Sequence, residues 1–283
     1  MRIFSKTRQT PQWFCLLFAA TVSLCLTLQA CSQSANQKTQ LLLTGSSTVA
    51  PLIAEIAEQY EQNHPEVTIE VKTGGSNQGI EDVRSGKNDI GMISRSPKAE
   101  EEDLQVFTIA QDGIGLIVHQ SVPIERLERQ TVIDIFTGKI TSWKALGGAD
   151  RPIEVLSKTS NHSTVGLFAD YFGLDVEDIQ PTHFIGDNTE ILETVLENPD
   201  AIGYISIGAG EYSIVHGMPL KMLPLEGVAA TIKQVSQGNF PLSRPLNLLT
   251  KELPSGLTKD FIDFAISPDV HDIIERQAFI PAA

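Results

Sequence analysis

The sequence has no surplus of positive charge: 21 Lys and Arg residues stand against 35 Asp and Glu residues, and the formal net charge is −14. Nucleic acids and anionic lipid surfaces are bound by clusters of basic residues, so this balance argues against both as partners. With 41% hydrophobic and 20% charged residues, the composition also argues against a disordered chain and a polytopic membrane protein. We therefore expect a globular protein of about one or two domains.

Acidic residues are missing from the N-terminal region, in which the first is Glu55. A short basic segment, residues 2–8, precedes an apolar run at 13–28 that is too short to cross a bilayer comfortably. Residues 1–30 are therefore predicted to be a secretory signal peptide. The alternative is a signal anchor that is never removed.

Cysteine is equally scarce, with residues only at positions 15, 25 and 31. Cleavage before Cys31 would leave it as the single cysteine, so no intrachain disulfide is predicted. The segment Leu28-Gln29-Ala30-Cys31 resembles a bacterial lipobox, in which the cysteine is acylated. These residues predict a lipid anchor on Cys31, a periplasmic or cell-surface location, and a flexible polar tether over residues 31–40.

Short apolar segments alternate with amphipathic helical patterns through the rest of the chain. The apolar segments predict strands at 41–43, 67–71, 89–94, 114–118, 153–156, 183–185, 202–207 and 245–250. The helical periodicity predicts helices around 52–60, 80–85, 165–172, 191–196, 261–266 and 270–274. This order of strands and helices is the pattern of a parallel α/β sheet.

Small-residue loops join a strand to a helix at four places: Gly45–Thr48, Gly74–Ser76, Lys158–Thr164 and Gly186–Thr189. The first turn of a helix leaves backbone N–H groups unpaired at the positive end of the dipole, so each loop could bind an anion. N-capping by Ser or Thr is the simpler explanation for any single loop. However, two loops precede the strand at 114–118 and two follow it, so two facing lobes would direct all four helix starts into one cleft. The nearby cations Arg95 and Lys158 favour the anion site.

Several motifs carry a resemblance to a known family: Gly45–Thr48 with Pro51, Gly74–Ser76 with Gly79-Ile80, Asp89–Arg95, Ile135–Ile140 with Trp143, Ala201–Tyr204 and Pro241–Pro245. By these motifs the chain resembles the phosphate-binding lipoproteins and periplasmic proteins of ABC phosphate importers. The resemblance implies a type II periplasmic-binding fold, with two α/β lobes joined by a hinge and the anion in the inter-lobe cleft. Lobe I would comprise residues 41–115 and 222–283, and lobe II residues 116–221.

The resemblance also implies ligand-binding residues in both lobes. Lobe I would contribute Ser47, Thr48, Val49, Ser76, Ser94 and Arg95, and lobe II would contribute Lys158, His162, Ser163 and Thr164. The family's lobe II motif usually reads Arg, two residues, then Gly-Ser-Gly-Thr, where this chain has Lys158-Thr159-Ser160-Asn161-His162-Ser163-Thr164. Lys lacks the bidentate fork of Arg.

A second departure concerns the acceptor for the ligand's proton. Some members of the family have an Asp at the position of Arg95. That Asp accepts the proton of hydrogen phosphate, and it rejects sulfate, which has no proton to give. An arginine side chain cannot accept a hydrogen bond. Neutral His162 could serve as acceptor instead. Equally, His162 could be a solvent-facing residue at the start of a helix.

These features predict a solute-binding protein, not an enzyme, that captures inorganic phosphate and delivers it to an ABC permease in the membrane. Sulfate, molybdate or tungstate remain alternative ligands, and an anion sensor without transport remains an alternative role. An esterase with Ser47 or Ser163 as nucleophile and His162 as base is disfavoured, because the sequence has no Gly-x-Ser-x-Gly or Ser-x-x-Lys signature.

No cofactor or metal is predicted, because His119, His183, His216 and His271 lack metal-like spacing. The acidic run at 100–103 predicts a solvated face or a helix start, since it lacks the alternating ligands and the glycine of a calcium loop. The expected assembly state is a monomer.

Overall fold

The computed structural model of the chain describes residues 39–282. The predicted signal peptide, Cys31 and the predicted tether up to residue 38 lie outside the described residues. The last two residues of the predicted tether, Thr39 and Gln40, instead begin strand β1 (Thr39–Gly45), so the prediction of a tether extending to residue 40 is wrong there. Within residues 39–282, no helix combines the length and the apolar character needed to cross a membrane.

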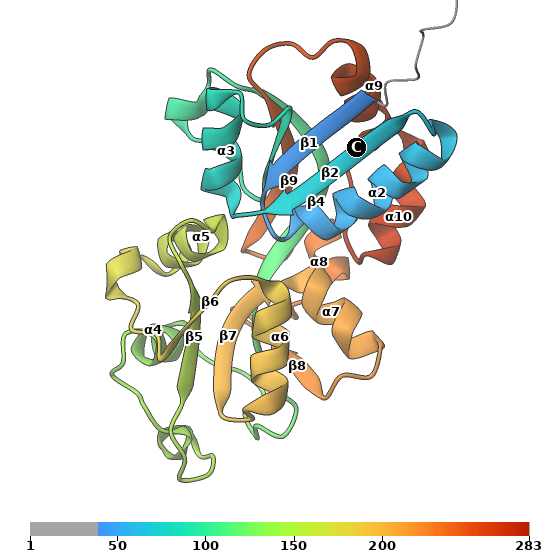
Figure 1. The fold of residues 1–283 in the computed structure, drawn as a ribbon. Coiled ribbons are helices and arrows are strands. Elements are labelled where there is room, and N and C mark those ends of the chain that lie inside the picture. Colours follow the sequence, from blue (N-terminus) through green and yellow to red (C-terminus); the bar gives the residue numbers. More distant parts are fainter. Residues whose placement is uncertain (1–38, 283) are drawn as a thin grey trace, which may run out of the picture. The chain divides into compact units, whose positions relative to one another are not determined.

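The first part of the fold alternates strands and helices as the sequence predicts (Figure 1). Its elements are β1 (Thr39–Gly45), α2 (Val49–Asn63), β2 (Val67–Thr73), α3 (Ser76–Ser85), β3 (Ile90–Ile93) and η1 (Ala99–Glu101). The helix predicted around 80–85 is confirmed as part of α3. Gly86 closes it with φ 70°, a left-handed conformation that glycine adopts without a steric penalty.

The middle of the chain contains one long strand followed by further strand and helix pairs. Its elements are β4 (Gln105–His119), α4 (Arg129–Phe136), η2 (Trp143–Leu146), β5 (Glu154–Lys158), α5 (Ser163–Phe172), η3 (Val176–Asp178), β6 (His183–Ile185), α6 (Asn188–Glu197), β7 (Ala201–Ser206), α7 (Ile207–Val215), β8 (Leu220–Leu223) and α8 (Ile232–Ser236). The C-terminal part adds β9 (Ser243–Thr250), α9 (Gly256–Ala265), η4 (Pro268–Val270), α10 (His271–Arg276) and β10 (Ile280–Pro281).

The sheet is mixed, where the sequence predicted a parallel one. The strand order is β2-β1-β3-β9-β4-β7-β5-β6, with β8 and β10 also pairing with β4. The pairs β1–β3, β5–β6 and β5–β7 are parallel as expected, but β9 is antiparallel to both β3 and β4. The reason is that β9 carries the chain back in the direction opposite to β4 and inserts between β3 and β4.

Strand β4 belongs to two halves of the fold. Residues Gln105–Gly113 pair with β9, whereas Ile114–Val118 pair with β7. The predicted strand at 114–118 is therefore only the C-terminal part of β4. Its first half was missed because polar residues such as Gln111 and Asp112 interrupt the apolar pattern there.

Each half has its own hydrophobic core on both faces of its strands. In the first half, α2, α9 and α10 cover one face, and α3 covers the other (Figure 1). Neighbouring residues of β9 show the alternation, because Leu248 points into one core and Leu249 into the opposite one. In the second half, Leu116 and Ile117 of β4 divide in the same way between the core under α4 and α5 and the core under α6.

We call these halves lobe I and lobe II and propose that the chain returns to lobe I near residue 243. The sequence placed this return at 222. However, Leu223, Leu225, Phe240 and Leu242 pack in the core under α4 and α5, and β8 pairs with the lobe II part of β4. By core membership, residues 222–242 therefore belong to lobe II.

Candidate functional site

Hydroxyl side chains from both lobes meet in one buried group. This hydroxyl cluster comprises Ser46, Thr48, Ser76, Ser94, Ser163 and Thr164, all buried. Ser163 Oγ of lobe II lies 2.9 Å from Ser94 Oγ and 3.1 Å from Ser76 Oγ of lobe I. Ser46 Oγ donates to Ser94 Oγ at 2.9 Å. Three of the loops identified in the sequence therefore converge at one place.

Arg244 of β9 is the fixed cation of this cluster, and it is only 3% exposed. Its Nε and Nη2 donate to Asp112 Oδ2 at 3.1 and 2.8 Å. Its Nη1 donates to Thr164 Oγ1 at 3.0 Å and to Ser94 Oγ at 3.2 Å, while Nη2 also reaches Thr48 Oγ1 at 3.2 Å. Asp112 thus holds one edge of the guanidinium, and the other donors face the hydroxyl cluster. This arrangement suits charge-assisted hydrogen bonds to an anion.

A second cation, Lys158, enters from the end of β5 and is 1% exposed. Its Nζ donates to Asn188 Oδ1 at 2.6 Å, and Asn188 Nδ2 donates to Thr48 Oγ1 at 3.4 Å. Burial, and then the charge of Arg244, lowers the pKa of Lys158 to about 7. Through Asn188 the fourth loop of the sequence also joins the cluster.

The helix starts at the cluster differ in capping. The N-cap residues of α2, α3 and α5 are Thr48, Gly75 and His162, and none of their side chains accepts a capping hydrogen bond. In α6, by contrast, Asp187 accepts from the Glu190 N–H at 2.9 Å. At the start of α2, Ser46 Oγ accepts from the N–H groups of Thr48 and Val49 at 3.2 and 3.4 Å. Capping by a side chain therefore accounts for the loops at 45–48 and 186–189, but not for those before α3 and α5, whose first turns retain N–H groups that can bind an anion.

Two predicted residues of the first loop lie beside the cluster. The side chain of Val49 is fully buried in the lobe I core, so only its backbone could serve a ligand; its N–H lies 3.4 Å from Ser46 Oγ. Ser47 lines a cavity of about 450 Å³ together with Thr48 and Asn188.

The structure does not bring the guanidinium of Arg95 to the hydroxyl cluster. Its Nη1 and Nη2 donate to the two carboxylate oxygens of Glu101 at 2.6 and 2.7 Å, and Nη1 also donates to Ser96 O at 3.0 Å. Although burial raises the pKa of Glu101, the hydrogen bonds from Arg95 and from the Lys98 N–H hold it below its ordinary value. Arg95 thus compensates a buried carboxylate. Of the two predictions for residues 100–103, the solvated face is wrong for Glu101, which is 5% exposed, and the helix start is confirmed, because Glu100 and Glu101 lie in the first turn of η1.

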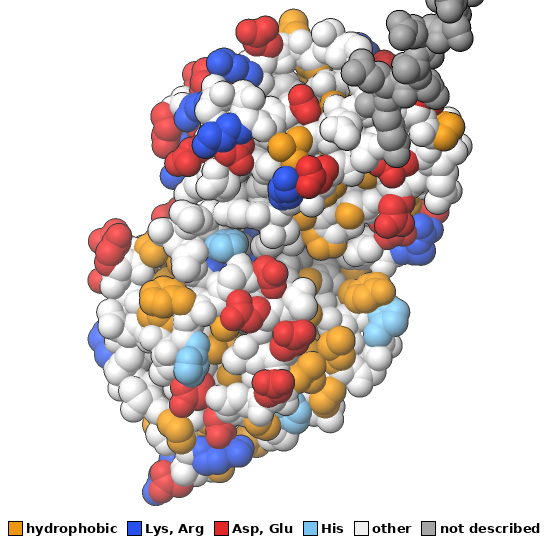
Figure 2. All heavy atoms as spheres, in the orientation of Figure 1, with side chains coloured by type: hydrophobic (Ala, Val, Ile, Leu, Met, Phe, Trp, Pro, Cys, Tyr) orange, Lys and Arg blue, Asp and Glu red, His pale blue; other side chains and the backbone are white. Residues whose placement is uncertain are grey.

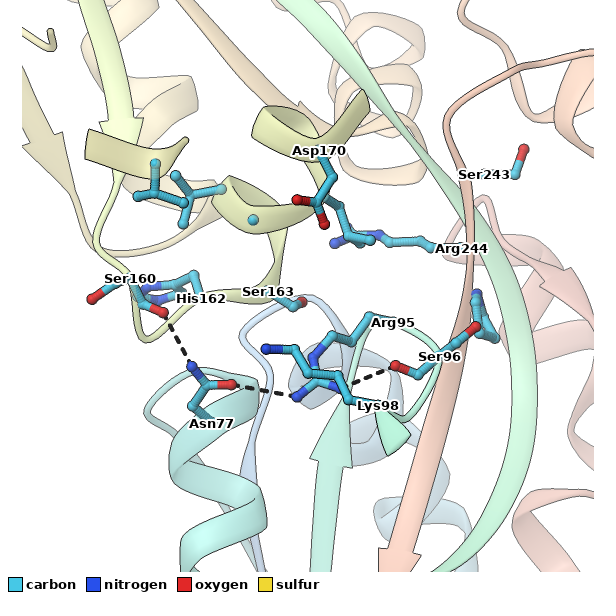
Figure 3. Close-up of a pocket in the computed structure, with 15 residues that line it drawn as sticks. Asn77, Arg95, Ser96, Lys98, Ser160, His162, Ser163, Asp170, Ser243 and Arg244 are labelled. Carbon is cyan, nitrogen blue, oxygen red and sulfur yellow. Dashed lines mark hydrogen bonds between the residues drawn. The ribbon is translucent and has the colours of Figure 1, made fainter. Parts of the chain in front are cut away.

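His162 lies at the mouth of the site, on the wall of a cavity of about 390 Å³ (Figure 3). Arg95, Ser163 and Arg244 line the same cavity. The Nδ1 of His162 contacts Thr159 Oγ1 at 3.2 Å, and burial followed by the charge of Lys158 lowers its pKa. The imidazole is therefore neutral at pH 7, the form needed for the predicted acceptor role.

The lobes also meet directly beside the cluster. Asn77 Nδ2 of α3 donates to Ser160 O at 3.1 Å (Figure 3). The backbone N–H of Asn77 donates to Asn161 O at 3.3 Å. Gly75 approaches the same loop so closely that a Cβ atom there would lie 2.4 Å from Asn161 O. The described lobes are thus closed on each other around the hydroxyl cluster.

The outer surface contrasts with this interior. Figure 2 shows Asp and Glu side chains over much of the visible face, with Lys and Arg side chains in small groups between them. A protein with net charge −14 repels anions at long range, so an anion site must depend on local buried donors. Arg244 and Lys158 are buried donors that could serve such a site.

Sequence reasoning missed four residues of the site: Ser46, Asp112, Asn188 and Arg244. Ser46 and Asn188 lie inside loops that the sequence did single out. Arg244 lies in the Pro241–Pro245 motif, which served only as a family signal. Asp112 had no local signal, because its partner Arg244 is 132 positions away in the chain.

Known proteins with similar sequences are named as phosphate-binding proteins. A sequence profile described as the PBP superfamily domain matches residues 31–269. The phosphate-binding protein PstS of Staphylococcus haemolyticus is 30% identical over 238 residues, covering 78% of this chain and 75% of that protein. The phosphate-binding protein PstS of Bacillus subtilis is 28% identical over 250 residues, covering 85% and 80% respectively.

A solved structure agrees with the sequence matches. It is a crystal structure, with bound phosphate, of a protein assigned as a phosphate ABC transporter substrate-binding protein from Clostridium perfringens. Its TM-score with this chain is 0.79 at 33% sequence identity, and the superposition covers 87% of this chain and 100% of the other.

Proposed function

The chain belongs to the PBP superfamily and, within it, to the phosphate-binding proteins, and on that premise we propose that it captures inorganic phosphate outside the cytoplasm for an ABC importer. The family confirms the type II periplasmic-binding fold that the sequence predicted. The anion would lie between the lobes, where it meets donors from both.

The observation that carries this proposal is the convergence of donors at the hydroxyl cluster. Four loops and β9, which are far apart in the sequence, bring hydroxyl groups, first-turn N–H groups and the cations Arg244 and Lys158 to one buried place. Exclusion of water strengthens hydrogen bonds to an anion. Among the predicted ligands, we retain Thr48, Ser76, Ser94, Lys158, Ser163 and Thr164 with the backbone N–H of Val49.

The remaining predicted ligands receive different roles. Ser47 and His162 would border the anion from the adjoining cavities. We assign Arg95 to the support of the loop that follows β3, because Glu101 occupies its donors. Arg244 takes over as the fixed cationic ligand.

Calorimetric titration of the full chain in detergent tests the ligand. We expect saturable binding of phosphate at one site per chain, and no comparable heat from sulfate, molybdate or tungstate. If one of these anions bound and phosphate did not, that anion would be the ligand in place of phosphate. The proposed architecture of the site would stand.

A lipid anchor on Cys31 would hold the protein at the membrane that contains its permease, in the periplasm or at the cell surface. Metabolic labelling with a radioactive fatty acid tests it. We expect label in the wild-type chain and none in Cys31→Ser. Equal labelling of both would overturn the anchor.

The chain would bind and release its anion without changing it, as a monomer. A Ser–His nucleophile pair is not supported, because His162 contacts Thr159 while Ser163 contacts Ser76 and Ser94. Incubation with a chromogenic phosphomonoester should therefore give no turnover. Phosphate uptake in cells that lack the gene distinguishes transport from sensing. Uptake would fall if the protein serves an importer, and would remain normal if it is only an anion sensor.

A further inference from the structure

Of the two basic side chains buried at the site, Arg244 has an acidic partner and Lys158 has none among the described residues. Arg244 has a carboxylate partner, Asp112, at 2.8 Å. Lys158 is equally buried, yet the hydrogen-bond partner of its Nζ is the neutral amide oxygen of Asn188. Within the described part of the chain, no carboxylate lies within the 4.0 Å of Lys158 Nζ that defines an ion pair. A buried ammonium without a counter-charge is costly, so the neutral amine is favoured at this position.

Several elements packed around Lys158 carry charged or titratable groups. The Tyr204 hydroxyl of β7 accepts from the Lys158 N–H at 3.2 Å, and burial raises its pKa to about 12, so it stays neutral. Arg244 of β9 opposes the positive charge of Lys158, whereas Asp187 at the start of α6 and Asp112 of β4 support it. His162, before α5, is itself kept neutral by burial and by Lys158. Their combined effect is a pKa of about 7 for Lys158, far below the ordinary 10.5, and burial is the largest cause.

We propose that binding of the anion is coupled to the uptake of one proton by Lys158, which converts from a neutral amine to an ammonium as the anion arrives beside it. This inference rests on the proposed function and deepens it. The proton comes from the buffer and is added to the lone pair of Nζ, so the pair formed in the site is ammonium and anion. The ligand itself is the counter-charge that the protein does not supply.

The coupling has a definite sign. At a pH well below about 7, Lys158 is already protonated before phosphate binds, so no proton is taken up at this residue. Above that pH the free protein holds the amine and the complex holds the ammonium. Proton uptake then rises toward about one per phosphate, and affinity falls by up to about tenfold per pH unit. Arg244 cannot contribute, because a guanidinium does not titrate in this range.

Calorimetry with inorganic phosphate in buffers of different ionisation enthalpy measures the proton number directly. The experiment compares the full wild-type chain at pH 6.0 and pH 8.5 with Lys158→Arg, which retains a positive charge that does not titrate. Protons exchanged by phosphate itself are common to both proteins. We expect the wild type to take up about one proton more than Lys158→Arg at pH 8.5, and no excess at pH 6.0.

A second variant keeps the inference testable if arginine does not fit at position 158. Asn188→Asp places a carboxylate against Lys158 Nζ and protonates it before phosphate arrives, so the excess uptake at pH 8.5 should also vanish. Lys139→Met, which removes an exposed lysine of lobe II, serves as the matched control and should retain the uptake.

The possible outcomes separate the two claims. A wild-type chain that does not bind phosphate would overturn the proposed function. Phosphate binding with the same proton number in wild type, Lys158→Arg and Asn188→Asp would overturn the coupling and leave the function intact.

Discussion

Lobe I contains two buried arginines, Arg95 and Arg244, that are alike in burial and in having an acidic partner. They differ in the direction in which their remaining hydrogen-bond donors point. Each is at most 5% exposed and each is paired with a buried acid. Arg95 uses both terminal nitrogens on Glu101. Arg244 meets Asp112 through Nε and Nη2 and directs Nη1 to the hydroxyls of the cleft.

The comparison shows that burial and charge do not identify an anion ligand. What decides the role is the direction of the donors that remain after the carboxylate partner is satisfied. In Arg95 the remaining donors meet Ser96 O and Asn77 Oδ1, so they support local structure. In Arg244 they converge with hydroxyls from both lobes, which is why we propose Arg244 and not Arg95 as the anion ligand.

The largest expected effect is on stability. Arg95→Met leaves the carboxylate of Glu101 buried without its partner, and we expect a loss of about 3–5 kcal/mol in the free energy of unfolding. Phosphate affinity at a temperature where the variant is folded should change less than about threefold. Denaturant unfolding and calorimetry measure the two quantities. A large loss of affinity in a stable Arg95→Met would reverse the assignment of the two arginines.

Arg244→Met should show its main effect in binding. Loss of the fixed cation is expected to weaken phosphate affinity by about 3 kcal/mol, or roughly a hundredfold. Because Asp112 would remain buried and unpaired, the double variant Arg244→Met with Asp112→Asn is the control that recovers stability without recovering affinity. Titration of both variants with phosphate checks this, and wild-type affinity in either would contradict the site.

Lys158→Met should stabilise the phosphate-free protein by about 1–2 kcal/mol while weakening phosphate binding. Between pH 10.5 and about 7 the unfolded chain holds a proton on Lys158 that the folded chain does not, so this lysine costs more stability as the pH falls. The cost is complete below about pH 7. Thermal unfolding should therefore show the largest gain at pH 7 or below and none near pH 10.5. A destabilised variant at pH 7 would contradict the buried neutral amine.

Gly75→Ala tests lobe closure, because the added Cβ would lie 2.4 Å from Asn161 O in the opposite lobe. We expect phosphate affinity to fall about tenfold while each lobe still folds. Gly86→Ala is the matched control: Gly86 also has a positive φ, 70°, but its surroundings are open. Equal affinities of the two variants would show that closure does not require this contact.

The smallest effect is expected at His162. If its neutral imidazole only borders the site, His162→Ala should change phosphate affinity by less than about 0.5 kcal/mol. If it accepts the ligand's proton, discrimination between phosphate and sulfate should fall in the same variant. Competition titration with sulfate distinguishes these roles.

Much of the fold could be predicted because its signals are local. Apolar runs placed β1, β3, β5 and β7, and helical periodicity placed α3 and α5. The mixed pairing of the sheet could not be predicted, because β9 inserts between two strands of much lower residue number. The same holds for the candidate site. The loops rich in Ser and Thr could be recognised in the sequence, whereas the pairing of Arg244 with Asp112 could not.

The sequence alone determined that helix starts rich in small hydroxyl residues recur four times around one apolar strand, and this pattern depends only on neighbours in the chain. The tertiary structure decided which cations face them. Glu101, six residues after Arg95, binds the guanidinium of Arg95 away from the hydroxyl cluster. Asp112, which is 132 positions from Arg244 in the chain, holds the guanidinium of Arg244 so that its remaining donors face the cluster. The direction of a buried charge depends on the acid that packs against it, and packing between distant segments exists only in the folded chain.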